Sequence, residues 1–135
     1  MIIILAVVVV YLSYTFISRQ IPAKPQETPS LVADTTRKII QIEVLNGCGI
    51  KGPASKFRVF LLTHGFDVVD VRNYKSFDLK ETLVIDRIGN LSNANEVAKS
   101  LGVSEKNVIQ QINPDYFVAV SVVIGKDYNQ LKPMM

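Results

Sequence analysis

Three glycines follow the apolar run at residues 39–45 with the spacing GxGxxG: Gly47, Gly49 and Gly52. Between a strand and a helix, this spacing is typical of a dinucleotide-binding turn, in which backbone N–H groups at the helix N-terminus hold a pyrophosphate. Asp67 and Asp70 lie about 20 residues farther along, where that fingerprint carries an acidic residue for the ribose. Nucleotide binding is therefore the first function that these residues suggest, and the rest of the sequence must be consistent with it.

The surrounding pattern argues against a dinucleotide fold. That fold needs further βαβ units to form its crevice, whereas the strand pattern at residues 66–72 is followed by another at residues 82–88 with no helix pattern between them. Pro53, directly after Gly52, is typical of a first helical residue, so the helix begins after the third glycine instead of containing it. We interpret the glycines mainly as residues that permit a tight strand-to-helix turn.

A weaker binding chemistry remains for the same loop. Backbone N–H groups of a glycine-rich turn that leads into a helix N-terminus favour an anion, and Lys51 adds positive charge beside them. A phosphate or carboxylate group of a polymer would fit such an anion-binding site. The residues of this candidate anion-binding loop are Asn46, Gly47, Cys48, Gly49, Lys51 and Gly52.

Catalysis and metal binding are not expected. Cys48 lies between two glycines and is expected to be at least partly exposed, but a thiol nucleophile needs a base within reach. The chain has one histidine, His64, at the far end of the predicted helix, about 16 Å away. One cysteine and one histidine form no metal cluster, and the acidic residues are scattered over strand ends and loops. We predict no enzyme activity, no metal site and no cofactor.

The charge pattern excludes one class of partner. The chain has 135 residues, with 15 Lys and Arg against 12 Asp and Glu, and a formal net charge of +3 at pH 7. These basic residues are spread along the chain, whereas nucleic-acid binding needs them clustered in a run or on a face. We therefore expect no nucleic-acid partner.

The N-terminal segment has the composition of a membrane anchor. Residues 1–18 carry no charged side chain, and as a helix they extend about 27 Å, close to the thickness of a bilayer's hydrocarbon core. The segment lacks the basic start and the small-residue cleavage site of a signal peptide, so an uncleaved single-pass anchor is favoured. Basic residues follow the span and only the terminal amine precedes it, which by a small margin favours a cytoplasmic domain.

A linker and a folded domain follow the anchor. Residues 19–37 contain Pro22, Pro25 and Pro29 among polar residues, a composition typical of a flexible, Pro-rich linker. The domain is expected over residues 38–128, with a tail at 129–135. Its predicted strands lie at residues 39–45, 66–72, 82–88, 108–112 and 117–124, and its predicted helices at 53–64 and 92–101.

The order of these elements predicts the fold class. We expect an α/β domain, a two-layer α+β sandwich of βαββαβ-like order with two helices on one face of a mixed sheet, preceded by one transmembrane helix. The strand at 117–124 is the most apolar and is expected at the centre of the sheet. In the first strand, Ile42 and Val44 are assigned to the core and Glu43 to the solvent, and Ser92 is expected to cap the second helix.

Short motifs recur in a fixed order over residues 39–128, at residues 42–49, 62–71, 82–85, 94–102 and 122–127. Together they resemble the LytR C-terminal domain family, which accompanies LytR-CpsA-Psr cell-wall proteins and also occurs alone behind a membrane anchor. The resemblance implies a stand-alone, membrane-anchored copy in the bacterial cell envelope, with the domain outside the cytoplasm, and this outweighs the weak charge bias. It implies no enzyme, because the catalytic region of those proteins is a separate, larger domain.

The expected function is thus a membrane-anchored, non-catalytic binding or interaction module of the cell envelope. Its expected partner is peptidoglycan, an anionic wall polymer or another envelope protein. Two alternatives stay open: a nucleotide- or anion-binding domain that uses residues 47–52, and a structural subunit that pairs with another protein through an exposed sheet edge.

Overall fold

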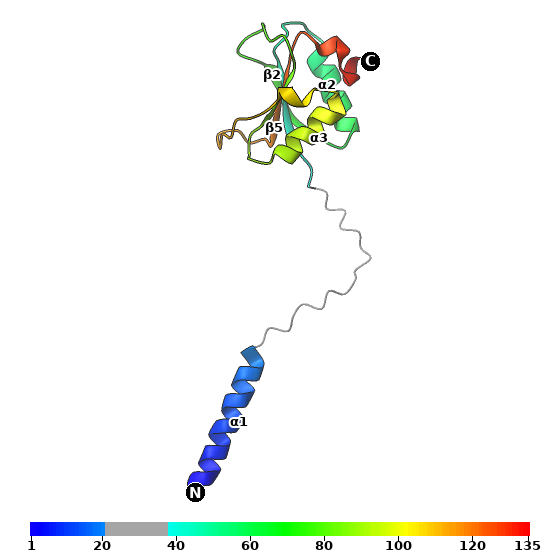
Figure 1. The fold of residues 1–135 in the computed structure, drawn as a ribbon. Helices are drawn as coiled ribbons and strands as arrows, with labels where there is room; N and C mark the ends of the chain where they lie inside the picture. The colour runs from blue at the N-terminus through cyan, green and yellow to red at the C-terminus, as the bar shows by residue number, and fades with distance from the viewer. Residues whose placement is uncertain (21–37) are drawn as a thin grey trace. The chain divides into compact units, whose positions relative to one another are not determined.

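The computed structural model describes residues 1–20 and 38–135, which belong to two separate units, Met1–Arg37 and Lys38–Met135 (Figure 1). In the first unit, α1 (Ile2–Gln20) confirms that the predicted anchor region is helical. Among the described residues, no helix combines the length and the apolar character needed to cross a membrane, so the predicted transmembrane span over 1–18 is not supported. Residues 19 and 20 belong to α1, and the rest of the predicted linker lies outside the described residues.

The second unit contains every strand and helix predicted for it. The elements follow the order β1 (Gln41–Asn46), α2 (Pro53–Thr63), β2 (Asp67–Asn73), β3 (Leu83–Asp86), α3 (Leu91–Leu101), β4 (Val108–Gln110) and β5 (Val120–Ile124). Two 3-10 turns, Tyr128–Gln130 and Lys132–Met134, occupy the predicted tail, where Leu131 is buried in the core. The mixed α/β class is therefore confirmed.

The described strands form one mixed sheet in the order β2-β1-β5-β3-β4. β1 runs parallel to both β2 and β5, β3 is parallel to β4, and β3 is antiparallel to β5. All five residues of β5 are buried, and the strand lies at the centre of the sheet as its apolar composition predicted. The edge strands among the described residues are β2 and β4.

Both α2 and α3 lie on the same face of this sheet, as predicted (Figure 1). Ile42 and Val44 point to that face from β1 and meet Phe57 and Leu61 of α2, and all four side chains are fully buried. Burying one such side chain contributes about 1.5–3 kcal/mol, so this layer accounts for most of the hydrophobic stabilisation.

The helix ends follow local rules with one exception. Pro53 begins α2, and Gly65 and Gly102 follow α2 and α3 with positive φ values of 86° and 82°, a conformation that glycine adopts without strain. Ser92 does not cap α3, because the helix starts earlier, at Leu91. The N–H groups of the preceding turn are instead satisfied by a buried carboxylate on β3, described below.

The helix-free face of the sheet is covered unevenly. Leu45, Ile85 and Val123 form a small buried cluster there, against which Tyr74 and Leu79 pack from the connection between β2 and β3. Farther along the same face, polar side chains replace the apolar ones and a second loop, residues 113–118, approaches the sheet. The candidate functional site lies in this polar part.

Candidate functional site

The structure places the residues of the predicted anion-binding loop together between β1 and α2, but several of their N–H groups are engaged within the protein. The Gly47 N–H donates to the Ile124 carbonyl at 2.9 Å. The Asn46 Oδ1 accepts the N–H groups of both Cys48 and Gly49, each at 3.2 Å. The loop therefore satisfies internally three of the donors that an anion would need.

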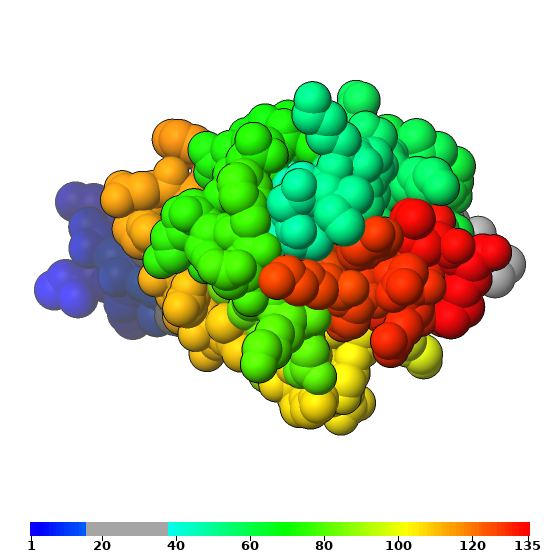
Figure 2. All heavy atoms as spheres, turned by 90° about the horizontal axis from the view of Figure 1, so that it is seen from above, coloured from blue at the N-terminus to red at the C-terminus, as the bar shows by residue number. Residues whose placement is uncertain are grey.

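Each glycine of this loop has a structural reason. A Cβ on Gly47 would lie 2.9 Å from the Ile124 carbonyl oxygen, too close for any side chain. Gly49 and Gly52 have φ values of 75° and 106°, and Gly49 also lies against Phe77. In Figure 2 the loop (cyan) is bordered by the connection between β2 and β3 (green) and by the segment after β5 (orange-red). These constraints account for the glycine spacing without a ligand.

The thiol and the imidazole both make contacts within the fold. Cys48 is buried, contrary to its predicted exposure, because it packs into the core under α2 and its Sγ lies 3.2 Å from Asn46 Oδ1. His64 directly follows the last residue of α2, where its ring stacks on Phe60 at 3.9 Å and its Nδ1 lies 2.7 Å from the Phe60 carbonyl oxygen. Lys51 is exposed. In the described part of the chain, no group of three His, Cys, Asp or Glu residues could hold a metal ion.

Glu43 is the residue whose environment the sequence pattern misassigned. Its side chain is only 3% exposed, although the alternation of β1 assigned it to solvent. The Ser121 hydroxyl donates to Glu43 Oε1 at 2.5 Å, and Arg72 Nη2 donates to Oε2 at 2.9 Å. The alternation identified the correct face of the strand, but the sequence gives no sign that another segment covers that face.

Arg87 connects this carboxylate to the covering segment. Its guanidinium Nε donates to the Ser121 hydroxyl at 2.9 Å, and its Nη1 donates to Gln111 at 3.3 Å. The ring of Tyr116 lies over the guanidinium at 3.9 Å, a cation–π contact that holds the 113–118 loop on the sheet. Glu43, Ser121, Arg87 and Arg72 form one network, in which each buried charge has an opposite charge or a hydrogen-bond partner.

A groove opens between β2 and the 113–118 loop, directly beside this network. In Figure 2 the loop (orange) lies next to the green segment that contains β2. The groove has a volume of about 430 Å³, and its lining residues are Glu43, Val69, Asp70, Arg72, Asp115, Tyr116, Phe117 and Val118.

The groove combines an exposed aromatic ring with charged groups of both signs. Phe117 is 91% exposed, so its ring is accessible to a ligand in the groove. Asp70 and Asp115 are exposed acceptors, and Arg72 presents further N–H donors beyond the one it gives to Glu43. This arrangement can hold a ligand that has both an apolar face and hydroxyl or amide groups.

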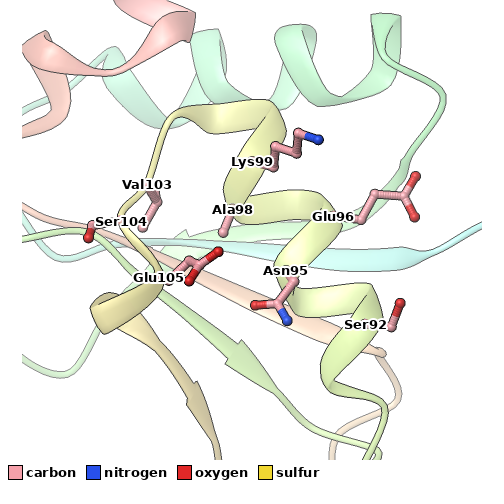
Figure 3. Close-up of a pocket in the computed structure, with 8 residues that line it drawn as sticks. All are labelled: Ser92, Asn95, Glu96, Ala98, Lys99, Val103, Ser104 and Glu105. Atoms are coloured by element: carbon pink, nitrogen blue, oxygen red, sulfur yellow. The ribbon is translucent and has the colours of Figure 1, made fainter.

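Two other hollows lack this combination. One of about 700 Å³ follows α3 and the chain after it, and its lining residues are Ser92, Asn95, Glu96, Ala98, Lys99, Val103, Ser104 and Glu105. In Figure 3 the Ser92 and Glu96 side chains point away from Glu105, so the polar groups do not converge. The other, of about 460 Å³, lies along α2 at Val59, Phe60 and Pro133 and is mainly apolar.

Asp86 is a second buried carboxylate, and its role is structural. Its Oδ1 accepts the N–H groups of Ile88, Gly89 and Asn90 at 3.1 Å each, and its Oδ2 accepts an N–H of Gln110 at 2.8 Å. Desolvation by burial acts to raise the pKa of Asp86, but the hydrogen bonds from Gln110 and the backbone outweigh it and hold this pKa below its usual value. The charge thereby fixes the turn that leads into α3.

Comparison with known proteins points to one family. The sequence pattern of LytR_C, a family described as LytR cell envelope-related transcriptional attenuator, matches residues 39–128, which contain both the groove and the glycine loop. The solution structure of the C-terminal domain of RV0431 is similar to this chain, with 23% sequence identity and a TM-score of 0.42 over 77% of this chain and 91% of that one. No curated protein matches the chain.

Proposed function

The chain belongs to the LytR_C family of cell-envelope domains, and on this premise we propose that it is a non-catalytic binding module whose groove holds a cell-wall glycan. The observation that carries the proposal is the position of Phe117, which is 91% exposed beside the charged groups of the groove.

The chemistry of a sugar chain fits this groove. A sugar ring has an apolar face of C–H groups, which packs on an aromatic ring, and an edge of hydroxyl groups, which hydrogen-bond to charged side chains. Phe117 offers the ring, Asp70 and Asp115 accept from hydroxyl groups, and Arg72 donates to ring or amide oxygens.

The two sides of the groove are fixed before a ligand arrives. Arg72 on β2 is held by Glu43, and Tyr116 on the opposite side is held by Arg87, which is itself only 5% exposed. Since few side chains must be ordered on binding, the entropy cost of association is small. A rigid groove of this kind suits recognition of a repeating polymer.

We place this module at the cell membrane, with the apolar residues 1–18 as its single-pass anchor and the domain outside the cytoplasm. The support is the uncharged composition of the segment and the envelope association of the family. Protease added to intact spheroplasts is expected to digest the domain, and protection of the domain there would contradict an external location.

Binding is tested with residues 38–135, which form a compact unit with its own core. This domain is expected to co-sediment with insoluble, purified peptidoglycan. Phe117→Ala is expected to lower the affinity at least about tenfold, since a buried aromatic contact is worth roughly 1.5–3 kcal/mol. Phe77→Ala is the matched control, because Phe77 is also exposed but lies against the glycine loop.

Each outcome separates the alternatives. Loss of binding in Phe117→Ala with retention in Phe77→Ala supports the groove. The reverse result moves the site to the glycine loop. Equal binding by both variants and the unchanged domain would show that the groove does not hold the glycan.

A further inference from the structure

The outer edge of β2 offers an unpaired backbone in a defined register. No strand of the described residues lies beyond β2 in the sheet. The Tyr74 N–H donates to the Asn46 carbonyl of β1 at 2.8 Å. Because peptide groups alternate along a strand, the N–H and C=O groups of Val71 and Asn73 point away from β1, toward the outer edge.

The side chains that flank Val71 carry opposite charges on one face of the sheet. Asp70 and Arg72 both lie on the helix-free face, where Asp70 is the partner of Glu43 in the β1–β2 register. Their side chains are 51% and 55% exposed, and Arg72 Nε lies 3.6 Å from Asp70 Oδ2, beyond hydrogen-bond length. The two groups thus form a long, exposed ion pair within the chain, which leaves further lone pairs of the Asp70 carboxylate for another donor.

We propose that two copies of this domain pair edge to edge through β2, antiparallel and centred on Val71. In this register the two Val71 residues exchange both N–H···O=C hydrogen bonds. Asp70 of each copy then lies opposite Arg72 of the other, in the closer, non-hydrogen-bonded type of pair, where Cα atoms are about 4.5 Å apart. The pairing thus forms two equivalent interchain ion pairs.

The charges select this register over its neighbours. Centring the two-fold axis on Val69 would place Asp70 opposite Val68, and centring it on Asn73 would place Arg72 opposite Tyr74. Only the Val71-centred arrangement among these three makes the edge self-complementary. The extra residue at Val69, where the β1–β2 register shifts, bends the first half of β2 and leaves the straight part for pairing.

The occupant of this edge is a second copy and not an unrelated strand. Charged side chains, prolines and bulges can protect an edge strand from pairing, but the acid and the base of this edge are spaced symmetrically about Val71, so in this register they attract a second copy. In the antiparallel pairing centred on Val71, no two like charges face each other. This is the pattern expected of an isologous, two-fold interface.

The pairing has a consequence for the groove. The two-fold axis of an antiparallel strand pair stands perpendicular to the sheet, so both helix-free faces lie on the same side. Asp70 and Arg72 belong to the groove lining as well as to the paired edge. The two grooves therefore flank the axis and face one surface, which would let one polymer be held at two points. The pairing itself does not depend on the identity of that polymer.

The test is the mass of residues 38–135 in solution, measured by sedimentation velocity over a range of concentrations. The unchanged domain is expected to convert from monomer to dimer as concentration rises. Val71→Pro is expected to stay monomeric and folded, because its missing N–H faces outward and takes no part in the sheet. Asp70→Arg is expected to stay monomeric because it places two arginines opposite each other, and Asp78→Arg, an exposed acid outside the edge, is the matched control.

A charge swap distinguishes pairing in this register from nonspecific association. Mixing Asp70→Arg with Arg72→Asp is expected to restore a dimer of one copy of each, since every facing pair is then of opposite charge. Circular dichroism melts of all variants report whether each is folded. A domain that is monomeric at every concentration, or a dimer that survives both Val71→Pro and Asp70→Arg, overturns the proposal. Peptidoglycan co-sedimentation of a folded, monomeric Val71→Pro variant keeps the glycan proposal testable on its own.

Discussion

Replacing Ser121 by alanine tests whether the polar network on the helix-free face is built as described. The Ser121 hydroxyl is fully buried, accepts a hydrogen bond from Arg87 and donates one to Glu43. The substitution removes both bonds at once while the backbone of β5 stays paired on both sides. It leaves two buried charges with fewer partners, which is the costly kind of loss.

The magnitude follows from the bonds lost and the contacts retained. A hydrogen bond to a charged group contributes about 1.5–3 kcal/mol, so two such bonds give about 3–6 kcal/mol. Glu43 keeps its ion pair with Arg72, and Arg87 keeps Gln111 and the Tyr116 ring, which favours the lower end of that range. For a domain of this size, about 3 kcal/mol corresponds to a melting temperature lowered by about 12–24 °C.

Urea denaturation of residues 38–135, followed by circular dichroism, measures this loss. Ser92→Ala is the matched control: Ser92 is exposed on α3 and makes no cap, so its change in stability is expected to stay within about 0.5 kcal/mol. If Ser121→Ala lowers the free energy of unfolding by less than about 1 kcal/mol, the hydroxyl does not bridge two desolvated charges. That result would also contradict a groove wall held rigid by this network.

Three further predictions follow from the structure. Asp86→Asn is expected to lower the stability of the fold at neutral pH and to make that stability less dependent on pH in acid. The pKa of Asp86 in the fold lies below its usual 3.8, so the charged carboxylate stabilises the fold above pH 3.8, and this stabilisation is lost as pH falls through the folded pKa. Thermal melts recorded across this pH range measure the difference. Gly125→Ala is expected to lower the free energy of unfolding, measured by urea denaturation, by more than about 3 kcal/mol, because a Cβ would lie 2.4 Å from the Glu81 carbonyl carbon. Gly65→Ala is the control: a Cβ there has open space around it, so the expected loss is about 1 kcal/mol from the positive φ alone. NAD or ATP is expected to leave the melting temperature unchanged, because the glycine loop uses its own N–H groups internally; a shift that disappears in Lys51→Gln would restore the anion-binding loop as a site.

Local signals in the sequence predicted most of the fold correctly. Pro53 and Gly65 bound α2, and the apolar composition of β5 indicated its central place in the sheet. The family could also be recognised from short motifs in order over residues 39–128, and the family match covers the same range. These features are readable because each depends on a residue's own conformational preference or on the period of its nearest neighbours.

The candidate site could not be predicted in the same way. The glycine spacing drew attention to the loop after β1, where the structure shows a turn that satisfies several of its own donors. The groove instead joins β2 to residues 115–118, more than forty positions apart in the chain, and nothing in the local pattern of either segment indicates that the two meet. Phe117 looked like the start of a buried strand, because an exposed and a buried phenylalanine next to valines have the same local pattern.

The sequence by itself therefore determined the elements, their order, the family and every helix end of the domain except the start of α3. The tertiary structure alone decided that Glu43 is buried against Ser121 and Arg72, that Arg87 holds the 113–118 loop on the sheet, and that β2 forms an edge with Asp70 and Arg72 spaced about Val71. The physical reason is that alternation along a strand assigns a side chain to a face, whereas its burial, its charge partner and its free backbone edge depend on which distant segment the fold brings to that face.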